Sequence, residues 1–287
     1  MIDLIRSFLD TWDLFRDTYL SAWLLALGLA MIGLGLVARA QIFIGVACTQ
    51  AATFGVAAAG ALGIAGGCAD GCGNDIDLRW LPMLLACLAA VPCCLWAFCS
   101  DSGRRHPEGV TGWIYLIGAA GTALCLSRSP EATNQIAAVL ASTVLGSSHR
   151  EMLCHLLLVA FCLSFCFCWR RPLCLILADR SQALAQGLPV RRLEATFAFF
   201  AGLMIGVSLV SAGVLYTFGC LILPALAARR FSRDFAPRFW LAPLLALAAV
   251  IPAFILGVHW DLPQAHLSVL LLGALVPVAA LWRRFRS

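Results

Sequence analysis

The sequence predicts an all-α fold: a polytopic membrane helical bundle of about eight or nine transmembrane segments, with one short cytoplasmic helix. Two observations carry this prediction. The 287 residues are 62% hydrophobic and only 12% charged, and so few charges cannot cover the apolar surface of a soluble domain of this size. Several apolar runs also approach about 20 residues, the length that a helix needs to cross the hydrocarbon core of a bilayer.

Apolar runs between charged breaks predict the membrane segments in order, and no long linker separates them. They are residues 19–38, 42–66, 80–99, 110–127, 152–169, 195–212, 214–228, 239–258 and 267–282. Residues 1–287 are therefore predicted to form a single transmembrane domain. Residues 1–18 have apolar side chains at helical spacing and several aspartates, which predicts an interfacial amphipathic helix and no signal peptide. The seventh run is short, which predicts a broken helix or half of a hairpin inside the bundle.

The arginines predict the orientation of the chain. If the charged segment near residue 180 is cytoplasmic and the segments alternate, few basic residues face outward. Of the 20 basic residues these are Arg6, Arg16, Arg79, Arg128 and Arg150. Because cytoplasmic loops carry the excess of positive charge, the N-terminus is predicted outside and the C-terminus in the cytoplasm, in a multi-pass protein of the cell (inner) membrane.

A charged insert, residues 179–194, interrupts the apolar segments. Asp179 is a suitable N-cap, and Gln182 at the third helical position completes a capping-box-like pair. Gly187 suits a left-handed stop and Pro189 prevents continuation, so residues 180–186 are predicted to form a sharply bounded helix of about two turns. One reading is an ordinary capped loop helix. The other is a docking site for a soluble partner that pushes on it.

These residues resemble a known family. Asp179, Ala183, Gly187, Pro189 and Arg191 resemble, at their spacing, the coupling-helix segment of zinc/manganese-type ABC transporter permeases. The stretch from residue 213 through the Leu-Pro-Ala at 223–225 is similar to that family's next signature. Residues 43–57 and 261–263 also fit, so the resemblance extends over most of the chain.

The resemblance implies a membrane subunit of an ATP-driven importer for a divalent metal such as zinc, manganese or iron. Two ABC ATPase subunits would dock on the coupling segment, residues 179–193, and an extracytoplasmic solute-binding protein would deliver the cargo. The permease would work as a dimer with a second copy or a paralogue, in the lipid bilayer, and tilting of its spans would switch access. Gly213, Gly219 and Pro224 would be the hinge of the predicted hairpin.

No enzymatic activity is expected of this chain, and it has no catalytic residue and no bound cofactor in this interpretation. The sequence contains no GxxxxGK[ST] phosphate loop, so ATP and Mg²⁺ would bind in the separate ATPase subunit. No nucleic-acid partner is expected.

The second span departs from the family pattern. The family has Asp and His, four residues apart on one helix face, where this chain has Val46 and Gln50. Valine and an amide are poor ligands for a first-row metal. The chain could therefore pair with a ligand-bearing permease, carry a soft metal past Cys48, Thr49 and Gln50, or move a chelate or another cargo. Alternatively, residues 48–50 only pack against neighbouring helices.

Other candidate ligands lie in the predicted outer loops and in one span. Cys68 and Cys72 are favoured as a small disulfide loop, with metal capture as the alternative. His259, Asp261 and His266 could guide cations or contact the binding protein, although solvated loop residues are the simpler reading. One further candidate for the substrate path is His155, because an ionisable residue within a span usually faces the bundle interior.

Two other classes of protein fit less well. An ion-coupled secondary carrier usually has charged residues at mid-membrane, and these are scarce here. A membrane-embedded enzyme would need nucleophile, acid–base or metal clusters, and no HExxH motif or paired intramembrane carboxylates occur.

Overall fold

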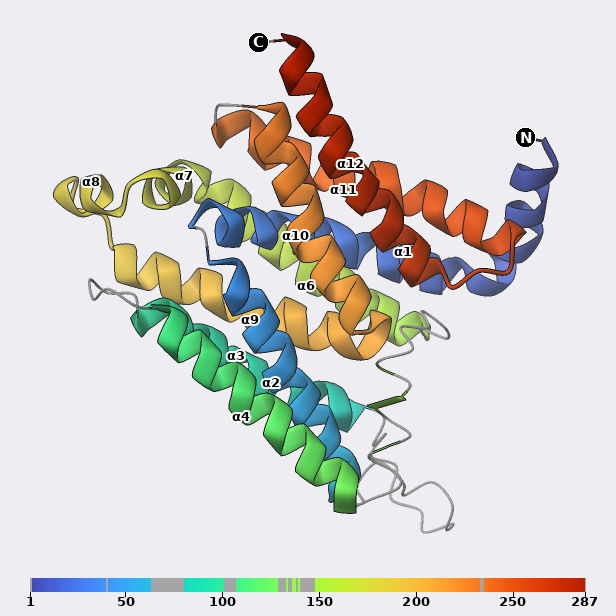
Figure 1. Ribbon diagram of the computed structural model, residues 1–287, viewed down its shortest axis with the longest axis horizontal. Coiled ribbons are helices and arrows are strands. Elements are labelled where there is room, and N and C mark those ends of the chain that lie inside the picture. Colours follow the sequence, from blue (N-terminus) through green and yellow to red (C-terminus); the bar gives the residue numbers. More distant parts are fainter. Residues whose placement is uncertain are drawn as a thin grey trace. The chain divides into compact units, whose positions relative to one another are not determined.

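The computed structural model describes residues 2–39, 41–62, 80–100, 107–128, 148–232 and 235–286, with a few positions between 133 and 139. Regular structure in these residues is helical (Figure 1). The helices are α1 (Ile2–Ala38), α2 (Ile42–Ala61), α3 (Leu81–Ser100), α4 (Pro107–Arg128), α6 (His149–Cys168), α7 (Arg170–Ala178), α8 (Arg180–Ala185), α9 (Val190–Ala212), α10 (Val214–Phe231), α11 (Phe235–His259) and α12 (Gln264–Arg286).

Nine of the helices in the described part of the chain are long and apolar enough to cross a membrane. They coincide with the nine segments expected from the apolar runs, so the fold class is confirmed. A segment that crosses lipid must form a helix to satisfy its backbone hydrogen bonds, and it must present apolar side chains to the lipid. Its apolar run in the sequence therefore marks the helix.

Three boundaries differ from the sequence expectation. The predicted interfacial helix at residues 1–18 is not separate, because α1 runs without a break from Ile2 to Ala38. The second segment was expected to reach residue 66, but α2 ends at Ala61. The seventh segment is expected to be a broken helix or half of a hairpin, and of these the broken helix is excluded, because α10 is one helix of 18 residues with Pro224 inside it.

The chain forms two compact units, each made from separated stretches of sequence. Unit 1 contains residues 1–42, 142–193 and 215–287, and unit 2 contains residues 43–141 and 194–214. The coupling segment, residues 179–193, therefore belongs to unit 1, and the rest of α9 from Glu194 belongs to unit 2. The second span belongs to unit 2.

Close backbone contact holds α1 against α10 in unit 1. A Cβ on Gly33 would lie 1.6 Å from the carbonyl oxygen of Leu221, so no other residue fits at this crossing. The buried hydroxyl of Tyr216 donates a hydrogen bond of 2.8 Å to the carbonyl of Ala22. This bond satisfies a polar group that would otherwise be costly in an apolar interior.

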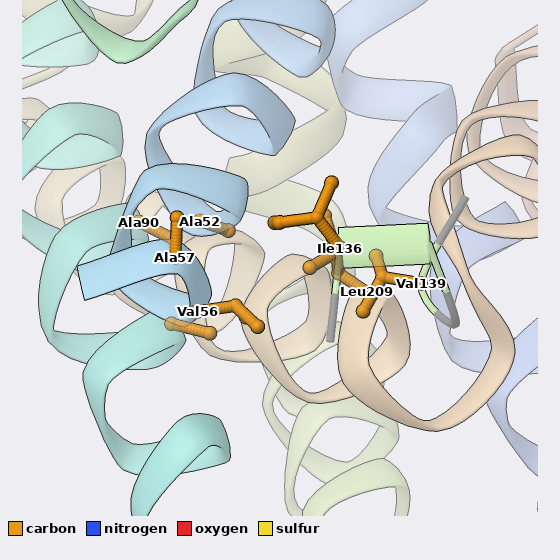
Figure 2. Packing of buried hydrophobic residues seen from close by; sticks show 8 residues of the cluster. Ala52, Val56, Ala57, Ala90, Ile136, Val139 and Leu209 are labelled. Carbon is orange, nitrogen blue, oxygen red and sulfur yellow. The ribbon is translucent and has the colours of Figure 1, made fainter. Parts of the chain in front are cut away.

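Small side chains dominate the core of unit 2 (Figure 2). Ala52 and Ala57 of α2 lie with Ala90 of α3 and Leu209 of α9 in one buried cluster. A Cβ on Gly55 would lie 2.4 Å from the carbonyl oxygen of Leu85, so α2 and α3 also touch through their backbones. Small residues at helix contacts permit this close approach, which is a common way for helices to associate in membranes.

Candidate coupling helix and substrate path

Asp179 caps the start of α8 as the sequence predicts, whereas the predicted capping-box pair with Gln182 is not completed. Asp179 has extended backbone angles (φ −151°, ψ 106°), and its carboxylate accepts hydrogen bonds from the backbone N–H groups of Ser181 and Gln182, at 2.9 and 3.2 Å. The Ser181 hydroxyl also donates to this carboxylate. The hydroxyl bond, followed by the Gln182 N–H bond, lowers the pKa of Asp179 from its ordinary value. Gln182 contributes its backbone N–H to this cap, whereas a complete capping box occurs at the start of α6, between Ser148 and Glu151.

The end of α8 is a Schellman motif. Gly187 has φ +72°, in the left-handed region where glycine is favoured. Its N–H donates to the carbonyl of Leu184 at 3.0 Å, and the Leu188 N–H donates to the carbonyl of Ala183 at 3.3 Å. Helix α9 begins at Val190, immediately after Pro189. The predicted stop at Gly187 is therefore confirmed, with two of the last carbonyls of α8 satisfied.

A small hydrophobic cluster joins α8 to its neighbours within unit 1. Ala183 is fully buried and lies with Ile176 of α7, Val190 and Leu193 of α9 in one cluster. Phe165 of α6, Leu175 and Leu188 border it. A displacement of α8 therefore acts directly on the ends of α6, α7 and α9.

The opposite face of α8 is open. Gln182, Ala185 and Gln186 are exposed, and the side chain of Leu184 is 51% exposed although it is apolar. Arg191 is exposed at the start of α9. An apolar residue presented among polar ones on a short, well-capped helix is suited to contact with a protein partner.

Within unit 2, the face of α2 that carries Val46 and Gln50 lies toward α4. Val46 lines a cavity of about 590 Å³ together with Phe43, Thr111 and Tyr115. A Cβ on Gly118 of α4 would lie 2.9 Å from the backbone of Gln50, so the two helices approach closely there. This cavity has an apolar wall with two hydroxyl-bearing side chains.

Cys48 lies on the other side of α2. It is fully buried, and its sulfur lies 2.8 Å from the sulfur of Cys94 on α3. The buried Thr49 hydroxyl donates to the carbonyl of Val46 at 2.7 Å. The structure therefore does not bring Cys48 to the cavity that Val46 lines, and the thiol pair belongs to the contact between α2 and α3.

The remaining path candidate and the hinge candidates occupy different places. His155 is buried on α6, in unit 1. Gly213 has φ +86° and separates α9 from α10. Gly219, in contrast, lies inside α10, where a Cβ would meet the side chain of Val269 at 2.6 Å. Because Gly219 has no side chain, α10 can pack closely at this position. Pro224 is also buried within α10.

The predicted outer-loop ligands are not brought together. His259 ends α11, Asp261 is exposed with φ +49°, and His266 is half-buried on α12. In the described part of the chain, no three His, Cys, Asp or Glu side chains are placed to hold a metal ion together. Cys68 and Cys72 lie outside the described residues.

Comparison with known proteins gives the family. The ABC 3 transport family matches residues 11–284. The chain belongs to this family. A relative from Haemophilus influenzae described as "Probable iron transport system membrane protein" is 24% identical over 226 residues, which is 75% of this chain and 83% of the relative.

Two solved structures share the fold. One is described as "PsaBC from Streptococcus pneumoniae in complex with Fab", with a TM-score of 0.78, 15% identity, and coverage of 99% of this chain and 100% of that one. The other is "An inward-facing conformation of a putative metal-chelate type ABC transporter", with a TM-score of 0.72, 16% identity, and coverage of 96% and 89%. This member of the ABC 3 family is therefore a multi-pass permease subunit of an ABC transporter, as the coupling-helix residues suggested.

One element of this permease had no counterpart in the sequence expectation. Helix α7, Arg170–Ala178, fills the interval between the fifth predicted span and the insert. It buries Leu173 and Ile176 on one side and exposes its arginines on the other. The apolar residues at a spacing of three were the available signal.

Proposed function

We propose that this chain is the membrane permease of an ATP-driven importer for a metal-containing cargo. A cytoplasmic ABC ATPase dimer would dock on α8, and a solute-binding protein would hand over the cargo at the outer face. Family membership and the iron transport named for the Haemophilus influenzae relative support this proposal. The arginine distribution supports an outer N-terminus and a cytoplasmic C-terminus.

The observation that supports the coupling role is the way α8 is capped at both ends and packed against its neighbouring helices. Caps at both ends keep the helix formed, and Ala183 on its inner side contacts the cluster that includes α7 and α9. Its outer side presents Leu184. A push from an ATPase on this face would therefore reach the ends of membrane-spanning helices without an intervening flexible loop.

Co-purification of the cognate ATPase with the full-length permease tests this role. Leu184→Glu places a charge at the centre of the proposed contact and should abolish co-purification, because burying an unpaired charge in an interface is costly. Leu262→Glu is the matched control, since Leu262 is 45% exposed in the turn before α12, which is predicted on the outer face. It should retain the ATPase.

Both variants should elute and melt like the wild type, because neither side chain is buried. Retention of the ATPase by folded Leu184→Glu would overturn the docking role of α8. Loss of the ATPase in both variants would show that the effect is not specific to this face.

Two metal-containing cargoes are possible, a bare divalent ion and a metal chelate. The apolar wall at Val46 favours the second candidate, the chelate. A bare divalent ion requires oxygen or nitrogen ligands, and Val46 offers none where the family carries a carboxylate. A chelate brings its own ligands and can contact Phe43 and Tyr115 through apolar surface. A heterodimer, in which a partner permease supplies the ligands, is the remaining alternative.

Cargo-stimulated ATP hydrolysis separates these cargoes. The permease would be reconstituted in nanodiscs with its ATPase and solute-binding protein, and zinc, manganese and iron would be added as free ions and as chelates. Stimulation by free ions that Val46→Asp strengthens would support the bare ion. Stimulation by chelates alone, weakened by Tyr115→Ala, would support the second candidate. No stimulation by any metal in an intact complex would overturn both.

A further inference from the structure

A second cavity lies in unit 1, between α7 along its length and the start of α11. Its volume is about 570 Å³, and its wall includes Arg170 and Arg171 of α7 and Phe239 and Trp240 of α11. The proposed functions of α8 and of the second span use none of these residues.

The cavity carries a concentrated positive charge. Arg170 and Arg171 are adjacent in sequence, both are exposed, and both line the cavity. No carboxylate is among its described lining residues. Two like charges held together beside an apolar wall repel each other, and an anion bound between them would remove this cost.

The cavity also lies at the level where two spans leave the membrane. The α6 span ends at Cys168 and the α11 span begins at Pro237. Trp240 and Phe167 are 56% and 54% exposed, and their rings are 5.9 Å apart. The Arg170 guanidinium lies 5.6 Å from the centre of the Phe167 ring. Exposed aromatic rings beside arginine at span ends are typical of the headgroup layer of a bilayer.

We propose that this cavity binds the headgroup of an anionic phospholipid. The phosphate would lie between Arg170 and Arg171, because guanidinium groups bind phosphate oxygens through paired hydrogen bonds. The acyl chains would descend along Phe167 and Trp240. A free phosphate ion could bind the same arginines, but it has no apolar part that would contact the exposed aromatic wall. A phospholipid has both parts, and for this reason the proposed occupant is a lipid.

A bound lipid would hold α7 at the membrane surface. Helix α7 leads directly into Asp179, the N-cap of α8, so its position sets where α8 is presented. The site thus concerns the support of α8 and does not depend on the identity of the cargo.

Lipid retention by the detergent-purified full chain tests the proposal. Phosphatidylglycerol and phosphatidylcholine would be supplied in equal amounts, and retained lipid would be measured by native mass spectrometry. The double variant R170Q/R171Q should bind phosphatidylglycerol roughly 30-fold more weakly, because each arginine near a membrane surface contributes a factor of between about five and six and the two factors multiply. The matched control R229Q/R230Q changes another exposed arginine pair, at the end of α10, and should retain phosphatidylglycerol like the wild type.

Three outcomes would overturn the proposal. One is that R170Q/R171Q and R229Q/R230Q retain equal amounts of phosphatidylglycerol. Another is that the wild type retains phosphatidylglycerol and phosphatidylcholine equally. The third is displacement of phosphatidylglycerol by millimolar inorganic phosphate, which would indicate a free-anion site. Should R170Q/R171Q fail to fold, Trp240→Leu removes the exposed indole ring from the cavity wall without changing an arginine, and it should still lower retention several-fold. Normal retention in that variant would contradict the proposal.

Discussion

Gly187 allows the most direct test of how α8 is held. Its φ of +72° is unfavourable for any residue with a Cβ, whereas a Cβ at this position would meet nothing within 4 Å. Replacing it with alanine therefore introduces no clash, and its cost is the backbone term alone. That term is about 1–2 kcal/mol for a left-handed conformation, which corresponds to roughly a 5–30-fold change in the local opening equilibrium.

Hydrogen exchange of the full-length permease in nanodiscs measures this opening. The reporting amides are those of Gly187 (or its replacement) and Leu188, which donate to the carbonyls of Leu184 and Ala183. Their protection should fall by roughly 5–30-fold in Gly187→Ala. It should fall less in Gly187→Asn, because asparagine tolerates the left-handed region.

Gly273→Ala on α12 is the matched control. A Cβ there also meets nothing within 4 Å, but its backbone lies outside the left-handed region. Alanine should therefore leave protection unchanged or raise it, since alanine is the better helix former by about 1 kcal/mol. Unchanged protection at Leu188 in Gly187→Ala, or an equal loss in the control, would refute the argument that the Schellman motif holds α8.

Two further predictions concern the first turn of α8 and the contact of α2 with α3. Hydrogen bonds lower the pKa of Asp179 below its ordinary 3.8, so its stabilisation of α8 is present above that value and lost as the pH falls through the lowered pKa. Exchange protection of the first turn of α8, corrected for intrinsic rates, should decline on acidification in the wild type and change little with pH in Asp179→Asn. Because the Cys48 and Cys94 sulfurs are 2.8 Å apart, hydrogen peroxide should join them as a disulfide, with loss of two protons and two electrons from the thiols. Mass spectrometry under non-reducing conditions should find this pair and lose it in Cys48→Ala, whereas a different first pair would contradict the packing of α2 on α3.

The sequence was sufficient where local chemistry decides the structure. The nine spans follow from apolar length, and the bounds of α8 follow from Asp179 and Gly187, whose conformations depend on their immediate neighbours. The family followed from the same residues, because the coupling segment combines these caps at a fixed spacing.

The sequence was insufficient where a residue's role depends on which helix faces it. Gly213 and Gly219 are the same residue type in one signature, yet they have different roles. Gly213 separates two helices, whereas Gly219 lies within α10 and packs against Val269. Cys48 and Val46 are two positions apart on α2, and only Val46 faces the cavity, since Cys48 contacts Cys94. Hydropathy carries no information on such pairings, because every side of these helices is apolar.

The relative strength of caps and cluster decides how α8 would respond to a push. Burial of Ile176, Val190 and Leu193 contributes about 1.5–3 kcal/mol for each side chain, whereas the glycine stop contributes about 1–2 kcal/mol in all. The cluster beside α8, to which α8 itself adds only Ala183, is thus more stable than the closure of the helix at Gly187. Weakening Gly187 should therefore reduce coupling between ATP hydrolysis and transport before it lowers the stability of the permease, since the cluster remains when the last turn of α8 opens. A variant that melts earlier without losing coupling would show the reverse order and would place the weak point in the cluster.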